Sequence, residues 1–333
     1  RSLKYEEFLR FQTKLQLNRS INFSGQFGKV KVFDRRLIQA WMKHLPFELT
    51  TDQVQVLNEI LNDLQSKQRM NRLLQGDVGS GKTVIAALAM YATALAHYQS
   101  ALLAPTEILA RQHAETLKTY LPDTLRIEVL YSSLSIQQKR KILNDLKNNE
   151  IDILVGTHSL IQEDVVFANC GLVVADEQHR FGVKQRQLLS EKGDKVDFLL
   201  MSATPIPRTL AAVLFNDVEI STITNYHASK QNTKTILVRE NSIKPIYAPL
   251  LKRFEMKDQV YFVCPSIEQS DRPSKSVEVI AAALRKGLPS HIKIGVLHGR
   301  LSADEKNKVL ERFYAQDYDC LVTTTVIEVG VNI

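Results

Sequence analysis

A glycine-rich loop near residue 80 constrains this chain more than any other feature of its sequence. Residues 76–83 read Gly-Asp-Val-Gly-Ser-Gly-Lys-Thr, which fits the phosphate-binding pattern G-x-x-x-x-G-K-[ST] at every fixed position. An apolar pair at residues 73–74 precedes the loop, and an alanine-rich apolar stretch at residues 84–96 follows it. A strand, this loop and then a helix is the arrangement in which backbone N–H groups wrap phosphates. The sequence therefore predicts a nucleotide-binding α/β domain with a buried helix after the loop.

The residue types in this loop have distinct tasks at a nucleotide. Lys82 would neutralise the β- and γ-phosphates of ATP, and Thr83 would hold Mg²⁺. The residues predicted to bind ATP through the loop are Gly76, Gly79, Ser80, Gly81, Lys82 and Thr83. Upstream, Phe47 and Gln53 are further candidates, because a glutamine amide offers the donor and the acceptor that suit an adenine edge. A plain helix start capped by one of the preceding threonines explains the same residues, so both interpretations stay open.

Two acidic residues follow another apolar run. Residues 172–175 lead directly into Asp176 and Glu177, and the carboxyl end of a strand is where an α/β sheet places its ligands. We predict that Asp176, with Thr83, contacts the Mg²⁺ shell and that Glu177 orients the attacking water. A lone pair of this kind often caps a helix instead. Its position after a phosphate loop favours a catalytic role, so Lys82, Asp176 and Glu177 are the predicted catalytic residues.

Short apolar runs alternate with helical patterns along most of the chain. They lie at residues 73–74, 101–104, 127–131, 151–156, 172–175, 198–201 and 219–223, and again at residues 235–238, 259–264, 292–296 and 319–323. Continuous apolar strands separated by helices are typical of a parallel sheet covered on both faces. We therefore predict an α/β fold.

A polar stretch at residues 225–232 separates the two series of runs. Because polar connections of this kind join compact domains, we place a hinge there. The predicted parts are a first lobe at residues 47–225 that binds ATP and a second lobe at residues 226–333. Residues 1–46 are predicted to be a helical linker before them. Its helices are expected near residues 4–17 and 34–43.

The charge of the chain is compatible with a polyanionic partner but does not establish one. The net charge is +7, from 43 Lys and Arg against 36 Asp and Glu, and the first fifty residues carry ten basic but only four acidic side chains. Such a segment suits nucleic acid, and it suits a solvated helical arm equally well.

The cysteines and the apolar stretches exclude several classes of protein. Cys170, Cys264 and Cys320 are far apart and form no C-x-x-C pair, which argues against a zinc site or a disulfide framework and for a reducing cytosol. The first ten residues alternate charged and apolar types, unlike a secretory signal. The apolar stretch at residues 84–96 is too short to span a bilayer.

Eight short blocks, taken together, resemble the motifs of superfamily 2 helicases. In chain order they are residues 76–83, 105–113, 156–158, 176–179, 202–205, 261–265, 297–301 and 322–330. The residues within these blocks are most similar to those of the RecG family. Examples are Asp-Glu-Gln-His-Arg-Phe-Gly-Val at residues 176–183 and Ala-Thr-Pro-Ile-Pro-Arg-Thr at residues 203–209. The resemblance implies two RecA-like lobes and an ATP-dependent DNA helicase that acts on stalled forks and Holliday junctions in recombination and repair.

The resemblance also implies where DNA is gripped and how ATP is linked to it. Small hydroxyl and backbone N–H groups in loops after strands can hold phosphates without reading sequence. The implied DNA-binding residues are Pro105, Thr106, Arg111, Thr157, His158, His298, Arg300, Thr324 and Thr325. The implied coupling residues are His179, Ser202 and Thr204. Helix caps for the threonines and buried core positions for the histidines explain these residues as well.

The family implies partners and a location in addition. These are ATP and Mg²⁺, branched or forked DNA, and single-stranded DNA-binding protein, with no membrane. The implied form is a monomer in the bacterial cytosol, associated with the nucleoid.

Three alternatives remain beside this interpretation. The transcription-repair coupling factor shares the stretches at residues 180–183 and 203–209. A kinase or transport ATPase would share the phosphate loop but not the blocks of the second lobe. RecG-like proteins also carry a wedge domain and a motif VI with an arginine finger, and the chain as given begins at Arg1 and ends at Ile333. We therefore expect a fragment with an incomplete second lobe that is weak or inactive alone, or that only binds nucleotide and DNA.

Overall fold

The computed structural model describes most of two compact units, Arg1–Lys230 and Gln231–Ile333. The described residues are 27–177, 195–203, 218–224, 235–237, 244–264 and 277–324, with the isolated positions 6, 9, 10, 13, 188, 192 and 193. Of the helix predicted near residues 4–17, positions 6, 9, 10 and 13 are described, and each is helical. The stretch predicted as a hinge, residues 225–232, lies outside the described residues.

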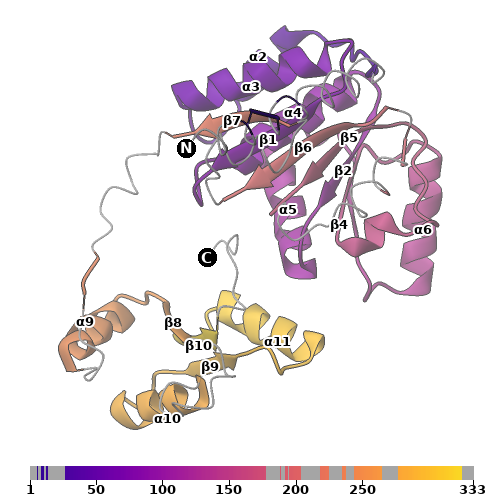
Figure 1. The fold of residues 1–333 in the computed structure, drawn as a ribbon. Coiled ribbons are helices and arrows are strands. Elements are labelled where there is room, and N and C mark those ends of the chain that lie inside the picture. The colour runs from indigo at the N-terminus through magenta and orange to yellow at the C-terminus, as the bar shows by residue number, and fades with distance from the viewer. Residues whose placement is uncertain are drawn as a thin grey trace. The chain divides into compact units, whose positions relative to one another are not determined.

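A seven-stranded parallel sheet organises the first unit (Figure 1). Its strands are β1 (Asn71–Gly76), β2 (Gln99–Leu103), β3 (Ile127–Leu130), β4 (Ile153–Gly156), β5 (Cys170–Ala175), β6 (Asp197–Ser202) and β7 (Glu219–Ile223). Their order across the sheet is β3-β4-β2-β5-β6-β1-β7, and every neighbouring pair is parallel. Strands β2, β4, β5 and β6 are buried along their whole length, which fits the apolar runs at residues 101–103, 153–155, 172–175 and 198–201 within them.

Helices cover this sheet and connect its strands. They are α2 (Arg35–Met42), α3 (Thr51–Leu64), α4 (Lys82–Leu95), α5 (Glu107–Tyr120), α6 (Ile136–Lys147) and the 3₁₀ helix η1 (His158–Ile161). Local chemistry fixes where several of them begin. Thr50 and Ser135 start α3 and α6 with capping boxes in which Gln53 and Gln138 bond back to the cap. Helix α4 is buried nearly all round, as its alanine-rich sequence predicted.

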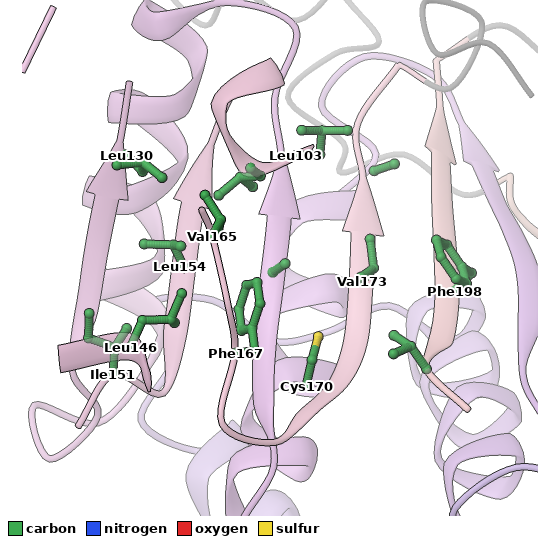
Figure 2. Packing of buried hydrophobic residues seen from close by; sticks show 14 of the residues in the cluster. Leu103, Leu130, Leu146, Ile151, Leu154, Val165, Phe167, Cys170, Val173 and Phe198 are labelled. Atoms are coloured by element: carbon green, nitrogen blue, oxygen red, sulfur yellow. The ribbon is translucent and has the colours of Figure 1, made fainter. Parts of the chain in front are cut away.

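The core of the first unit lies between the sheet and its helices. Figure 2 shows Leu103, Leu154 and Val173 on neighbouring strands, with Phe167 packed among them. Burial of each such side chain contributes about 1.5–3 kcal/mol relative to leaving it in water. This rigid layer carries the loops at the carboxyl ends of the strands.

Residues 27–46, the described part of the predicted linker, pack on the first unit. The backbone of Lys31 donates to the Leu64 carbonyl at 2.9 Å. The side chain of Lys31 is fully buried and forms an ion pair with Asp197 at the start of β6. Farther along, the indole N–H of Trp41 donates to the Tyr120 carbonyl at 2.8 Å. This segment therefore shares the packing of the nucleotide-binding domain.

The second unit has a smaller parallel sheet. Its strands β8 (Val260–Cys264), β9 (Ile294–Leu297) and β10 (Cys320–Thr324) lie in the order β8-β10-β9. The helices are α9 (Lys244–Glu255), α10 (Val277–Gly287) and α11 (Ala303–Tyr314). Phe254, Leu284 and Val322 belong to its main buried cluster, and Ser302 caps α11 with a capping box through Glu305.

The predicted α/β fold with parallel sheets is confirmed in both units. Residues 235–237, the described part of the run at 235–238 that was expected to be a strand, are not in a strand. The side chain of Leu237 is fully exposed there, whereas a strand needs a hydrogen-bonded neighbour. None of the helices in the described ranges is both long enough and apolar enough to cross a membrane.

Candidate functional site

The glycine loop connects the carboxyl end of β1 to the first residue of α4. Gly81 is the N-cap of α4 and has a φ of 88°, in the left-handed region that favours glycine. A Cβ atom at Gly81 would lie 2.3 Å from the Nε2 atom of Gln53. A Cβ at Gly76 would similarly lie 2.5 Å from the hydroxyl of Ser80. The two glycines therefore let the loop fold tightly over the helix N-terminus.

Two polar side chains of this loop match the needs of a polyphosphate. The ammonium of Lys82 donates to the carbonyl oxygens of Gly76 at 2.7 Å and Asp77 at 3.0 Å, so it lies across the loop. The hydroxyl of Ser80 is buried and has no hydrogen-bond partner in the described part of the chain. With the N-terminal N–H groups of α4, these groups form a cationic, donor-rich cradle that fits phosphates.

Gln53 connects helix α3 to the loop. Its Oε1 atom accepts from the backbone N–H of Thr50 at 2.8 Å, which completes the capping box of α3. Its Nε2 atom donates to the Ser80 carbonyl at 2.8 Å. The helix start that the sequence left open is thus present, with Thr50 as its cap. The adenine contact stays a prediction for Gln53 and for Phe47. The ring of Phe47 packs edge-on against that of Tyr120, with 5.6 Å between the ring centres.

The acidic pair follows β5 in the middle of the sheet. The Oδ1 atom of Asp176 accepts from the backbone N–H of Glu177 at 3.0 Å, and its Oδ2 atom lies 2.8 Å from Nε2 of His113 on α5. Glu177 is almost fully buried and has a φ of 51°. A non-glycine residue in this region is strained, and such residues cluster at functional sites.

Strand order brings three predicted motifs to one edge of the sheet. Strands β5, β6 and β1 are neighbours and parallel, so their carboxyl ends meet. Asp176 follows β5, Ser202 ends β6 and the glycine loop follows β1. Ser202, which was predicted to couple ATP to DNA, therefore lies on the strand between the two halves of the nucleotide site. Its predicted partners His179 and Thr204 lie outside the described residues.

Mg²⁺ fits this arrangement only together with a nucleotide. Within the described ranges, no group of three or more His, Cys, Asp or Glu side chains could hold a metal ion. At a nucleotide, however, Mg²⁺ keeps several waters and needs only one or two protein oxygens beside the phosphates. Thr83 at the start of α4 and Asp176 after β5 can supply these oxygens from the same sheet edge.

The predicted DNA-binding residues of the first unit follow β2 and β4. Pro105 precedes Thr106, and Thr106 is the N-cap of α5, where its hydroxyl accepts from the Leu109 N–H at 3.3 Å. Thr157 is buried and makes no such cap bond to η1, and His158 beside it is exposed. The capping alternative is therefore realised for Thr106 and not for Thr157.

Arg111 of the same set is exposed on α5. Its guanidinium lies 4.5 Å from the centre of the Tyr131 ring, which orients the group while leaving its donors available.

The second unit has its own predicted DNA-binding residues. His298 and the exposed Arg300 follow β9, and Thr324 ends β10 with a buried hydroxyl that has no partner among the described residues. Thr325 lies outside the described residues. All three described residues lie at or just after the carboxyl ends of parallel strands, as in the first unit.

Sequence reasoning missed His113. The residue belongs to a block that we assigned to a helicase motif, but it received no role. A histidine two positions after Arg111 on an expected helix was the available signal. Its partner Asp176 is 63 residues away, so only the fold brings the two together.

Two family models match the chain in succession. The DEAD/DEAH box helicase model matches residues 50–213, and the helicase conserved C-terminal domain model matches residues 243–333.

Curated relatives match along the whole chain. The ATP-dependent DNA helicase RecG of Staphylococcus epidermidis (strain ATCC 12228) is 44% identical over 337 residues, and that of Streptococcus pneumoniae serotype 4 is 43% identical over 334 residues. Each alignment covers 100% of this chain but only 49% and 50% of the respective relative. The chain thus spans about half the length of the curated relatives that it matches.

Solved helicase structures are also similar to this chain. The structure of RecG bound to a three-way DNA junction has a TM-score of 0.83 and 38% identity, and the match covers 99% of this chain and 43% of that one. The RNA-bound Mss116p structure has a TM-score of 0.61 at 17% identity, over 87% of this chain and 63% of that one, which shows the fold alone. Both sheets are therefore those of RecA-like helicase domains.

Proposed function

Since this chain is a RecG-type helicase sequence along its whole length, we propose that it is the ATP-driven motor of a DNA helicase that acts on branched DNA. The observation that carries the proposal is the convergence of the glycine loop, Ser202 and the Asp176–Glu177 pair on three adjacent strand ends. Such an edge can bind, hydrolyse and sense one nucleotide.

The side chains of the site divide the work of hydrolysis. Lys82 leaves the loop carbonyls and binds the β- and γ-phosphates, while the N-terminus of α4 adds its dipole. Glu177 orients a water in line with the γ-phosphate, and its strained, buried backbone holds the carboxylate in place. Mg²⁺ held with ATP by Thr83 and Asp176 would supply positive charge that offsets the negative charge of the phosphates. Catalysis is therefore mainly positional and electrostatic.

DNA is held by loops that do not read sequence. In the first unit these are the loops at Thr106 and Thr157, and in the second the loops at Arg300 and Thr324. Thr106 and Arg111 present a helix N-terminus and an exposed guanidinium, which both suit phosphate oxygens.

The preference for branched DNA rests on the RecG relatives. A RecG structure is bound to a three-way junction, and the same specificity is proposed for the protein that carries this chain. A role in repair and recombination, a monomeric state and a place in the bacterial cytosol at the nucleoid are part of the proposal. Support for the cytosol comes from three free, buried cysteines. Single-stranded DNA-binding protein as a partner stays a prediction from the family.

The experiment compares ATP hydrolysis by the full-length protein with a fork, a four-way junction and a linear duplex. All three are measured at one salt concentration, because phosphate contacts make affinity salt-dependent. We expect the fork and the junction to stimulate hydrolysis more than the duplex. Lys82→Ala, which removes the phosphate-binding ammonium, is the control and should show no stimulation by any DNA. Equal stimulation of the wild type by all three would refute the preference for branches.

A further inference from the structure

Helix α5 contributes a side chain to the acidic centre of the nucleotide site. The Nε2 atom of His113 lies 2.8 Å from Oδ2 of Asp176. The exposed fractions of the two side chains are 11% and 10%, so water screens the contact only weakly. An ionised carboxylate only accepts hydrogen bonds, and His113 therefore donates.

With this bond, each of the two carboxylate oxygens of Asp176 accepts a hydrogen bond from a different donor. Oδ1 accepts the backbone N–H of Glu177 at 3.0 Å, while Oδ2 is held by His113. A carboxylate with one donor on each oxygen cannot rotate about its χ2 bond without losing one of them. The orientation of the Asp176 carboxylate is thus set in part from α5.

The N-terminal half of α5 also carries residues that are proposed to bind DNA. Thr106 caps the helix and Arg111 projects from its exposed side, two residues before His113. The helix is 14 residues long and packs on β3, β4 and α4, so Thr106, Arg111 and His113 are held in fixed positions relative to one another. A displacement of this helix on DNA binding would therefore move the donor that holds Asp176.

A purely structural role for the pair is the alternative. A partly buried histidine needs hydrogen-bond partners wherever it lies, and a carboxylate on any neighbouring strand would satisfy it. Here the partner is the carboxylate of the proposed Mg²⁺ site, directly before Glu177 in the chain. Donors that orient metal-binding carboxylates control metal affinity as well as stability.

We propose that His113 is a positioning residue that holds Asp176 for Mg²⁺–ATP and connects this carboxylate to the DNA-binding end of α5. The inference rests on the proposed function, because it assumes that Asp176 serves the metal bound with a nucleotide. His113 touches neither nucleotide nor DNA in this role and acts through Asp176.

The test measures Mn²⁺ affinity by electron paramagnetic resonance in the full-length protein saturated with ADP, so it needs no turnover. His113→Phe keeps the ring and removes the donor, and we expect Mn²⁺ affinity to fall by roughly tenfold. His113→Gln retains an N–H donor and should recover part of this loss. The control is Glu115→Gln, which breaks only an exposed ion pair with Lys118 on the same helix and should bind Mn²⁺ like the wild type.

The outcomes separate the two proposals. Wild-type affinity in His113→Phe, or a glutamine variant as weak as the phenylalanine variant, would overturn the positioning role while leaving the nucleotide site intact. A wild type that binds no Mn²⁺ with ADP would overturn the nucleotide site and the inference together. Forked DNA should change Mn²⁺ affinity in the wild type and not in His113→Phe. An equal change in both would overturn the connection through α5.

A spectroscopic measurement on the unsubstituted protein avoids any effect of the variants on folding. The ¹⁵N resonance of His113 Nε2 should shift when Mg²⁺ is added to the ADP-bound protein, because Mg²⁺ then polarises the carboxylate that accepts the hydrogen bond from this N–H. An unchanged resonance at saturating Mg²⁺ would contradict the proposal.

Discussion

At the scale of single residues, Lys31 and Asp197 form a buried ion pair whose desolvation is costly. The two side chains are 0% and 2% exposed. Asp197 also accepts the backbone N–H of Met70 at 2.7 Å, and the ammonium of Lys31 lies 5.4 Å from the centre of the Tyr98 ring. Burying two charges costs several kcal/mol per ion, and mutual attraction and added hydrogen bonds offset this cost. Removal of one partner therefore leaves an uncompensated buried charge.

We predict that Lys31→Met lowers the free energy of unfolding by about 3–5 kcal/mol. The measurement is equilibrium unfolding in urea. Arg36→Met is the matched control, since Arg36 pairs with Asp34 at 4.0 Å on the surface of the same segment. Its loss should cost no more than about 1 kcal/mol. Equal effects of the two substitutions would show that Lys31 is not held as a buried ion.

The same substitution should depend on pH in a defined direction. Burial raises the pKa of Asp197, and the neighbouring Lys31 opposes this rise. Lys31→Met removes the positive charge that lowers the pKa of Asp197. The pKa of Asp197 in the folded variant therefore rises further, and the folded state favours the protonated carboxyl. The stability that is lost relative to the wild type should therefore be small near the unfolded pKa of about 3.9 and grow as the pH rises above it. A smaller loss at pH 8 than at pH 5 would contradict this assignment.

Sequence alone located the residues whose chemistry is local in the chain. The glycine loop and the Asp176–Glu177 pair are short patterns with a fixed context, and the structure has both at strand ends. The roles of Lys31 and His113 were not predictable, because their partners lie 166 and 63 residues away. A lone lysine in a basic segment also gives no sign that it will be buried.

At the scale of elements, the start of α3 illustrates how a helix cap supports a ligand loop. Gln53 bonds back to Thr50 with its oxygen and forward to the Ser80 carbonyl with its nitrogen. Helix α6 has the same capping box through Ser135 and Gln138, but there the glutamine is exposed and bonds within the box. The two boxes differ mainly in this link to the glycine loop.

Gln53→Glu should separate the two tasks of this side chain. A glutamate can still accept from Thr50, but it presents a second oxygen to the Ser80 carbonyl in place of a donor. We expect the free energy of unfolding to fall by about 1–3 kcal/mol and ATP affinity, measured by calorimetry, to fall with it. In the control Gln138→Glu, the substituted residue belongs to a capping box that is exposed to water. Its free energy of unfolding should stay within about 0.5 kcal/mol of that of the wild type. Unchanged ATP affinity in Gln53→Glu would show that the link does not support the loop.

Elements were predictable where one physical signal dominated. Apolar β-branched runs such as residues 172–175 became buried central strands, because only a sheet covered on both faces accommodates them. The run at residues 235–238 is also rich in β-branched residues, yet its described residues form no strand. Strand formation needs a pairing neighbour, and the sequence does not record which edges are available.

At the scale of the whole molecule, the two units share the same type of fold and the same placement of polar residues. A parallel sheet places polar side chains at the carboxyl ends of its strands, next to loops that can hold phosphates. The first unit adds the glycine loop and the acidic pair, while the second contributes Arg300 and Thr324. The resemblance to RecG covers both units, which supports the proposal of one ATP-driven motor with two lobes.

The most direct test of this account is ATP turnover by Glu177→Gln in the full-length protein with saturating forked DNA. Glutamine keeps the size of the side chain but cannot polarise the attacking water as a carboxylate does. ATP binding, measured by calorimetry, should remain close to that of the wild type, because the glycine loop and Lys82 are unchanged. The account predicts that turnover falls by about 10²-fold or more. A variant that binds ATP and hydrolyses it at a rate near that of the wild type would contradict the assignment of the catalytic centre.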